Sequence, residues 1–269
     1  MTYSVQLYTV RDALEADLRG TIRRLAEIGY RKVEPCAFET NTEELAAVFA
    51  ENDITAPTGH TLLFPVGAPA DIAGDIRPEA LPDQDKIFAA ARRLGIDAVI
   101  HPLVPPECWQ DIEAIRDTAA RLNAAAKRGA EYGVRVGYHN HDWEISSKIK
   151  GATALEVLAD LLDPQLVLEV DTYWAAVGGE NPAKILERLG ERVIAVHIKD
   201  GPATKDTAAQ LPAGQGEIDV WGALEAAKHL EVGIVEFDGY AGDIFEGIAS
   251  SLRYLEAGPG AELSRGGAR

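Results

Sequence analysis

The sequence predicts a single (β/α)8 TIM barrel, and three observations lead to this fold class. Short β-rich runs alternate with longer helical patterns along the 269-residue chain, which is the order of a parallel sheet covered by helices. Eight such strand–helix units fit into about 255 residues, which suits a closed barrel better than an open sheet. The glycine pattern of dinucleotide-binding folds and the P-loop pattern are both absent from the sequence. We therefore expect one barrel domain at residues 1–256.

Four strands and four helices are expected in the first half of the chain. The first helix is the clearest, because its apolar residues recur at three- and four-residue steps from Leu14 to Ile28 and Gly29 is a natural stop. Gly95 ends the third helix in the same way. A loop rich in glycine, alanine and proline is expected at residues 64–82. The expected strands are 4–8, 32–38, 54–60 and 98–104, and the expected helices are 11–28, 43–52, 84–94 and 109–132.

The second half of the chain repeats the alternation four times, with β-rich runs that end on polar residues. No linker and no second domain are recognisable before residue 256. Residues 257–269 are small and polar, and we expect them to form a disordered tail. The expected strands are 134–140, 166–171, 193–199 and 233–238, and the expected helices are 153–162, 182–189, 221–229 and 243–255.

Composition and charge exclude several classes of protein. The net charge is −17 and the pI is about 4.7, which argues against a surface for nucleic acid or for an anionic membrane. Cys36 and Cys108 show no paired spacing, so a disulfide framework is excluded and a reducing compartment, the cytoplasm, is expected. The sequence has neither a run of 18 apolar residues nor a signal-peptide pattern, so we expect no membrane partner.

Residues that can bind metals or move protons close most of the expected strands. The C-terminal ends of barrel strands form the mouth where active sites lie. Five of the six histidines fall at or just past such an end, whereas His229 lies in an expected helix and is interpreted as a surface residue. The strand-end residues are Glu34, His60, His101, His139, His141, Asp171, His197, Lys199 and Glu236.

Two carboxylates and two imidazoles at the ends of the last four strands predict a divalent metal site. A buried carboxylate has to be paired, protonated or metal-bound, because burying it alone is costly. Mixed nitrogen and oxygen ligands suit Mn²⁺, Co²⁺, Fe²⁺ or Zn²⁺ and disfavour Ca²⁺. An open shell that binds two substrate oxygens favours Mn²⁺ or Co²⁺ over closed tetrahedral zinc, and Mg²⁺ stays an alternative. The expected ligands are His139, Asp171, His197 and Glu236.

Six segments along the chain carry a resemblance to a known family. They are SVQLYTVRD at 4–12, YHNHDWE at 138–144, LEVDTYWAAVGGENP at 168–182, VHIKDG at 196–201, GQGEIDV at 214–220 and VEFD at 235–238. With these segments, the chain resembles the xylose-isomerase-like superfamily of TIM-barrel sugar isomerases and epimerases over nearly its whole length. Ketose 3-epimerases and inosose dehydratases belong to that superfamily.

The resemblance implies a metal set of Glu, Asp, His and Glu on strands five to eight. Asp171, His197 and Glu236 match this set, but His139 stands where the family has its first glutamate. A histidine at this position is similar to the inosose-dehydratase branch, which has a histidine-rich run at this strand end. His141 has the same strand parity as His139 and is the alternative ligand.

Four residues are candidates for catalysis: Glu144, Glu236, His141 and Lys199. Glu144 lies where ketose epimerases place a substrate-contacting glutamate. Glu144, Glu236 or a histidine of the pair at the end of strand five would remove a proton from the substrate. Lys199 would hold a hydroxyl, a carboxylate or a developing enolate, or else form a salt bridge.

Other residues near the mouth are expected to shape the substrate pocket. Trp174 can place an aromatic face against the apolar face of a sugar. The long loop at residues 201–220 looks like a flexible flap that becomes ordered over substrate. The substrate-binding candidates are Glu34, His60, His101 and Trp174.

These residues predict proton transfer next to the carbonyl of a keto-sugar or keto-polyol, through an enediolate. We therefore expect a metal-dependent sugar isomerase or epimerase, with a dehydratase of an inosose or 3-keto-sugar as the alternative. A sugar-binding or regulatory protein is the non-enzymatic alternative, whereas a DNA-repair endonuclease would need a basic groove. The expected partner is a small sugar or polyol, and the resemblance implies that a homo-oligomer can form.

Overall fold

Eight parallel strands form one sheet in residues 3–65 and 83–260, the parts of the chain that the computed structural model describes. Their order is β2-β1-β10-β9-β8-β5-β4-β3. Bridges from Lys32 to Thr55 and from Cys36 to His60 join the two outer strands, so the sheet closes into the predicted (β/α)8 barrel. The strands are β1 (Tyr3–Gln6), β2 (Val33–Glu34), β3 (Thr58–His60), β4 (Ala98–His101), β5 (Arg135–His139), β8 (Val167–Asp171), β9 (Val193–Ile198) and β10 (Val232–Val235).

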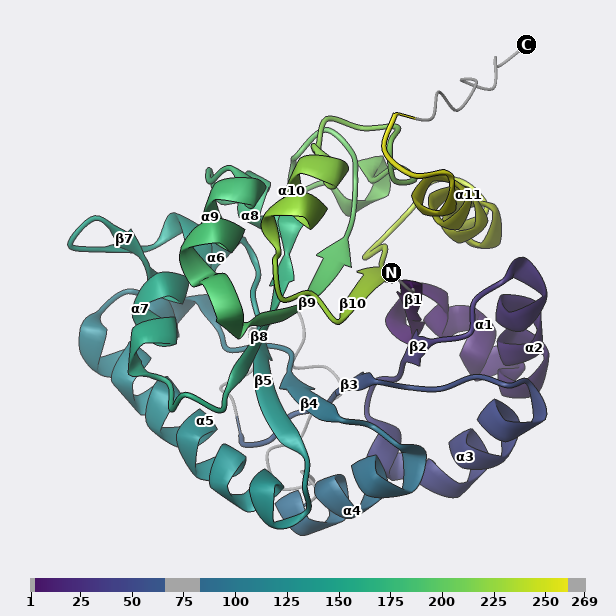
Figure 1. Cartoon of the computed structure of the whole chain (residues 1–269), viewed down its shortest axis with the longest axis horizontal. Helices are drawn as coiled ribbons and strands as arrows, with labels where there is room; N and C mark the ends of the chain where they lie inside the picture. The colour runs from purple at the N-terminus through teal and green to yellow at the C-terminus, as the bar shows by residue number, and fades with distance from the viewer. Residues whose placement is uncertain (1–2, 66–82, 261–269) are drawn as a thin grey trace.

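Helices surround the strands on the outside of the barrel (Figure 1). The last helix contacts the first strand–helix unit, where Tyr30 Oη donates to the carbonyl of Ile248 at 3.0 Å. The helices are α1 (Arg11–Ala16), α2 (Leu18–Ile28), α3 (Thr42–Glu51), α4 (Gln84–Leu94), α5 (Ile112–Glu131), α6 (Asp142–Ser146), α7 (Ala154–Leu161), α8 (Thr172–Val177), α9 (Pro182–Leu189), α10 (Val220–Ala226) and α11 (Ile244–Ala257).

The structure differs from the expected elements in several places. The first expected helix is two helices, because Asp17 leaves the helical conformation and caps α2 by accepting from the Gly20 amide at 2.9 Å. A short hairpin, β6 (Lys148–Ile149) and β7 (Ala152–Thr153), follows α6. His229 lies in a turn beyond the end of α10, and half of its side chain is exposed.

Parts of the expected loop and tail lie outside the described residues, namely residues 66–82 and 261–269. Within the described residues, no helix is long and apolar enough to cross a membrane.

The barrel interior changes from apolar to polar towards the mouth. Its lower part is an apolar cluster formed by strand residues alone: Ala98, Ile100, Val167, Ile194, Ala195, Val232 and Ile234. Ionisable residues follow two positions later on three of these strands, since Glu169 follows Val167, His197 follows Ala195 and Glu236 follows Ile234. Residues two apart on a strand face the same side. The strands therefore direct these ionisable side chains to the interior just above an apolar floor.

Candidate active site

The ends of the strands bring eight ionisable side chains together inside the barrel. The strand registers place His139 beside Glu169, and Asp171 beside His197. Because few charged groups are buried without partners, such a cluster indicates a functional site. Its members are Glu34, His60, His139, Glu169, Asp171, His197, Lys199 and Glu236, each at most 7% exposed.

Four of these residues, the ligands expected from the sequence, form a group at the mouth that suits a divalent metal. His139, Asp171, His197 and Glu236 each offer one donor atom, and these atoms lie within 4.8 Å of one another. His139 Nε2 is 3.9 Å from Asp171 Oδ2, and His197 Nδ1 is 2.5 Å from Glu236 Oε2. Two imidazoles and two carboxylates that converge in this way fit Mn²⁺, Co²⁺, Fe²⁺ or Zn²⁺.

Burial and charge act against each other on the two mouth carboxylates. Burial raises the pKa of Asp171 to about 6, even though Lys199 and His197 lower it. Burial also raises the pKa of Glu236, but the charges of Lys199 and His197 outweigh burial and hold this pKa well below its usual value. Both carboxylates are therefore ionised at neutral pH and available as ligands.

Lys199 supplies a buried positive charge beside these carboxylates. Its Nζ lies 2.9 Å from Asp171 Oδ2, 2.7 Å from Glu236 Oε2 and 2.7 Å from Asp238 Oδ2. Burial lowers the pKa of Lys199, but the three carboxylates outweigh this and hold the pKa well above its usual value. The side chain is therefore an ammonium donor at the mouth, and the expected salt bridge is also present.

A second polar layer, formed by Glu34, His60 and Glu169, lies directly beneath the mouth group. Glu169 Oε1 lies 2.6 Å from His60 Nε2, 3.1 Å from His139 Nδ1 and 2.9 Å from His197 Nε2. Glu34 Oε1 lies 2.8 Å from His197 Nε2. Glu34 Oε1 also accepts from Gln6 Nε2 at 2.7 Å. Glu34 and His60, expected to bind substrate, therefore contact other protein groups in this layer.

Glu169 is the residue that reasoning from the sequence missed. It precedes Asp171 by two positions in the LEVD segment, so it points into the same barrel interior. It is fully buried, and its carboxylate reaches three histidines. The signal that could have found it is a second carboxylate at the same strand parity as an expected ligand.

His141 is the N-cap residue of α6, and Glu144 lies in the first turn of this helix, just after β5. Glu144 is fully buried, with Oε1 accepting from Tyr138 Oη at 2.5 Å and Oε2 accepting from the His141 amide at 2.9 Å. Burial raises the pKa of Glu144 to about 8. His141 stacks on Trp143, with ring centroids 4.5 Å apart, and lies 5.4 Å from the His139 ring. In this arrangement Glu144 holds the start of α6, and His141 faces the mouth group.

His101 does not join the cluster, because its strand parity points it away from the barrel interior. It pairs in register with Tyr138, whereas the neighbouring Ile100 belongs to the apolar floor. Its Nδ1 accepts from the Leu63 amide at 3.0 Å, and its ring stacks on Phe64. Burial lowers the pKa of His101 to about 3, so it is a neutral structural residue here.

Trp174, a candidate for the pocket wall, lies next to the mouth group and is buried. Its backbone amide donates to Asp171 Oδ1 at 2.8 Å, which starts α8 directly after the strand. Its ring lies 5.7 Å from Lys199 Nζ, and its buried Nε1 has no hydrogen-bond partner. The indole therefore has an unused donor close to the charged groups of the mouth.

One buried carboxylate organises the long loop after β9, the segment expected from the sequence to be a flexible flap. Asp200 Oδ1 accepts from the amides of Gly201 and Ile218 at 2.8 and 3.0 Å. Its Oδ2 accepts from the amides of Gly214 and Gly216 at 2.8 and 3.0 Å. At Gly216 a Cβ atom would lie 2.1 Å from the Gly201 nitrogen, so only glycine allows this close approach. These contacts give the loop a defined fold around Asp200.

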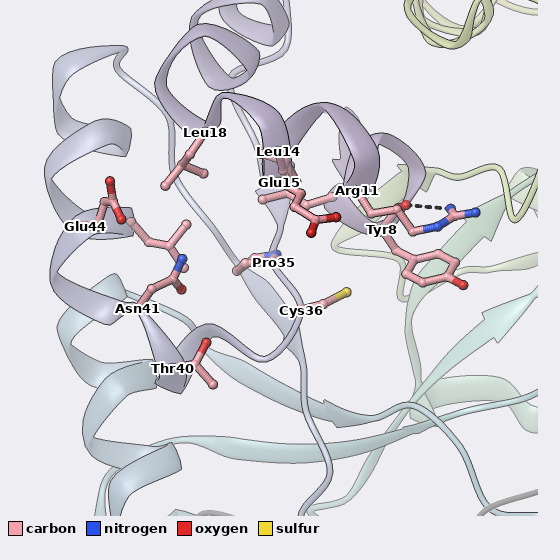
Figure 2. Close-up of a pocket in the computed structure, with 12 residues that line it drawn as sticks. Tyr8, Arg11, Leu14, Glu15, Leu18, Pro35, Cys36, Thr40, Asn41 and Glu44 are labelled. Atoms are coloured by element: carbon pink, nitrogen blue, oxygen red, sulfur yellow. Dashed lines mark hydrogen bonds between the residues drawn. The ribbon is translucent and has the colours of Figure 1, made fainter. Parts of the chain in front are cut away.

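A pocket of about 530 Å³ opens beside the mouth, between the ends of β1 and β2 (Figure 2). Tyr8 and Arg11 form one side of it, with the Arg11 guanidinium 4.2 Å from the centre of the Tyr8 ring. Cys36 lines the pocket and donates from Sγ to Gln6 Oε1 at 3.0 Å. Through Gln6 and Glu34 this pocket is connected by hydrogen bonds to the buried polar layer.

Comparison with known proteins explains this arrangement. The sequence model of the family described as xylose isomerase-like TIM barrel matches residues 22–257. The chain belongs to this family. That assignment confirms the resemblance and accounts for a barrel with its polar residues gathered at the strand ends.

Individual relatives are similar to this chain in structure or in part of the sequence, at low identity. A sugar phosphate isomerase/epimerase from Parabacteroides distasonis ATCC 8503 is 22% identical with a TM-score of 0.77, covering 96% of this chain and 94% of its own. The IOLI protein with a bound zinc atom is 18% identical with a TM-score of 0.70, covering 95% and 96%. An inosose dehydratase from Bacillus anthracis is 32% identical over 100 residues, 37% of this chain. That match spans only 30% of the dehydratase.

Proposed function

We propose that the protein is a divalent-metal-dependent sugar isomerase or epimerase that moves a proton next to the carbonyl of a keto-sugar or keto-polyol. The observation that carries this proposal is the convergence of His139, Asp171, His197 and Glu236 at the barrel mouth. The structural likeness to a sugar phosphate isomerase/epimerase and to a zinc-containing barrel supports it through the shared fold.

The same four residues are the proposed metal ligands. Their donor atoms converge, their side chains are buried and their carboxylates are ionised. A divalent metal held there supplies a Lewis acid that polarises a carbonyl and acidifies the neighbouring C–H bond.

Lys199 and His141 are the proposed groups that act on the substrate. The Lys199 ammonium can donate to the oxygen that becomes negative when the proton leaves. Burial lowers the pKa of His141 to about 4, so its imidazole is neutral at pH 7 and has a lone pair for a proton. His141 Nδ1 is buried without a hydrogen-bond partner, whereas Glu144 is engaged with Tyr138. We therefore assign the base to His141 in preference to Glu144.

A dehydratase acting on an inosose or 3-keto-sugar is the second candidate. It is favoured by the partial match to inosose dehydratases and by His139 at the position of the family's first glutamate. The first proton transfer would be the same, but the neighbouring C–O bond would then break and release water. The Lys199 ammonium, whose Nζ lies 2.7 Å from Asp238 Oδ2, is placed to donate the proton that the leaving hydroxide requires.

The test uses purified protein, its metal content and proton NMR in deuterated water. Keto-sugars and inososes are incubated with the protein and Mn²⁺, Co²⁺, Zn²⁺ or Mg²⁺, removing paramagnetic metals before spectra are recorded. Deuterium at the carbon beside the carbonyl would support proton transfer, and the product separates the two candidates. An inverted or isomerised sugar supports the first, and an unsaturated product supports the second. A metal-loaded protein that exchanges no proton in any of them would contradict both.

A further inference from the structure

Each histidine of the mouth group has one ring nitrogen towards the mouth and the other towards the lower polar layer. The nitrogen that faces the lower layer is Nδ1 in His139 and Nε2 in His197. His139 directs Nδ1 to Glu169 Oε1 at 3.1 Å and Nε2 towards Asp171 Oδ2 at 3.9 Å. His197 directs Nε2 to Glu169 Oε1 at 2.9 Å and Nδ1 to Glu236 Oε2 at 2.5 Å. One carboxylate oxygen of Glu169 therefore lies under both rings.

The chemistry of imidazole makes this arrangement informative. A neutral imidazole has one N–H group and one nitrogen lone pair, and only the nitrogen with the lone pair can bind a metal. The partner of the N–H group therefore decides which nitrogen is free. The fully buried Glu169 Oε1 lies close to His139 Nδ1 and His197 Nε2, and His197 Nε2 also has Glu34 Oε1 at 2.8 Å, so the lower carboxylates favour ring protons on these two nitrogens. A metal ion at the mouth would replace the proton that His197 Nδ1 shares with Glu236 Oε2. Each ring would then be neutral, with its N–H group on the lower layer and its lone pair towards the mouth.

We propose that Glu169 is a positioning residue that fixes opposite tautomers of the two histidines, so that His139 binds metal through Nε2 and His197 through Nδ1. This inference rests on the proposed metal site at the mouth. It adds a residue that is not itself a ligand of that site and names the ligand nitrogen of each ring.

The neighbours of Glu169 hold it in place for this role. His60 Nε2 lies 2.6 Å from Glu169 Oε1, and the His60 ring is stacked on His197 with an angle of 8° between the planes. Glu34 Oε1 lies 2.8 Å from His197 Nε2 and is itself fixed by Gln6. His197 therefore has two carboxylates beneath its Nε2, which favours a proton on that nitrogen.

The lower layer also resembles a metal site, but metal ions cannot occupy both layers at the same time if each ring has a single lone pair. His60, His139, Glu169 and His197 have donor atoms within 4.8 Å of one another. An ion there would need the downward nitrogens of His139 and His197, and an ion at the mouth needs the upward ones. Neutral rings can serve only one of these ions. We therefore expect one divalent ion per chain.

The test combines Glu169→Gln with nitrogen NMR of the histidine rings. Glu39→Gln is the matched control, since Glu39 is also a buried glutamate but accepts from Thr61 and contacts none of the site histidines. In the zinc-loaded wild-type protein, we expect the ring proton on Nδ1 of His139 and on Nε2 of His197. Zinc affinity, measured by competition with a chelator, should fall roughly 10–100-fold in Glu169→Gln and stay unchanged in Glu39→Gln.

The outcomes separate this inference from the proposed function. The same tautomer on both rings of the wild-type protein would overturn the inference even if the Glu169→Gln variant fails to fold. Equal zinc affinity in Glu169→Gln and the wild type, or two zinc ions per chain, would also overturn it while leaving a metal enzyme in place. A wild-type protein that binds no divalent metal would instead overturn the proposed function.

Discussion

Replacing Asp200 by Asn should open the loop after β9 and destabilise the protein. The Asp200 carboxylate accepts four backbone N–H bonds, from Gly201, Gly214, Gly216 and Ile218. An Asn side chain has one oxygen to offer, and its NH₂ group would face two of these donors. A buried donor left without an acceptor costs about 1–3 kcal/mol, so two of them cost roughly 2–6 kcal/mol.

Two of the four hydrogen bonds are only partly buried, so water can replace the lost acceptor for Gly214 and Gly216. We therefore expect a loss of about 2–4 kcal/mol in the free energy of unfolding, with local opening of the loop. Urea denaturation measures the first effect, and hydrogen exchange of peptides spanning residues 201–218 measures the second.

Asp206→Asn is the matched control for this experiment. Asp206 lies in the same loop but is exposed, and its side chain accepts only from the Ala208 amide, at 3.1 Å. Asn can replace that single bond, so the control should change the free energy of unfolding by less than about 0.5 kcal/mol. Equal stability and equal amide protection in Asp200→Asn and wild type would refute the role given to this carboxylate.

Four further predictions test the site. Asp171→Ala should lose both bound metal and turnover; metal analysis beside an activity assay checks this, and full activity would contradict the ligand assignment. Lys199→Met should remove the only buried lysine or arginine side chain of the described residues and lower the free energy of unfolding by about 3–5 kcal/mol in urea denaturation. His141→Asn should keep the metal but slow deuterium exchange by roughly 10²–10⁴-fold, and an unchanged rate would move the base elsewhere. The pKa of about 8 for buried Glu144 lies above the ordinary 4.5, so the folded state keeps a proton that the unfolded chain releases between these values. The stabilisation that Glu144 contributes should therefore be complete below that window and be lost as the pH rises through 8. Urea denaturation midpoints measured at both ends of the window should fall less from low to high pH in Glu144→Gln than in the wild type.

Much of the barrel could be predicted because each strand leaves a local signal. Short β-rich runs, helical periodicity and the glycines that end helices mark the eight units, and closure follows from their number. The sequence alone could place Asp171 and Glu236 near each other, since the carboxyl ends of parallel barrel strands all lie at the same rim. The break at Asp17 could not, because a residue that caps a new helix also fits the solvent face of a longer one.

The detailed roles at the site depend on which way each side chain points. His101 closes a strand as His139 does, but the register turns it outwards against Phe64. Glu144 has the right residue type beside the mouth, yet Tyr138 holds its carboxylate away from it. Glu169 lies one layer below Asp171, where only contacts between strands far apart in sequence show that it reaches three histidines. Such non-local pairings leave no pattern in a single segment.

The central claim is that a metal held by the four mouth residues supports proton transfer beside a carbonyl. The most direct measurement is deuterium incorporation into keto-sugars and inososes by wild-type protein and Asp171→Ala, with metal content determined on the same samples. The account predicts about one divalent ion per chain and exchange at the carbon beside the carbonyl in the wild type, with both lost in the variant. Wild-type protein without bound metal, or metal-loaded protein that exchanges no proton in any of these substrates, would contradict it.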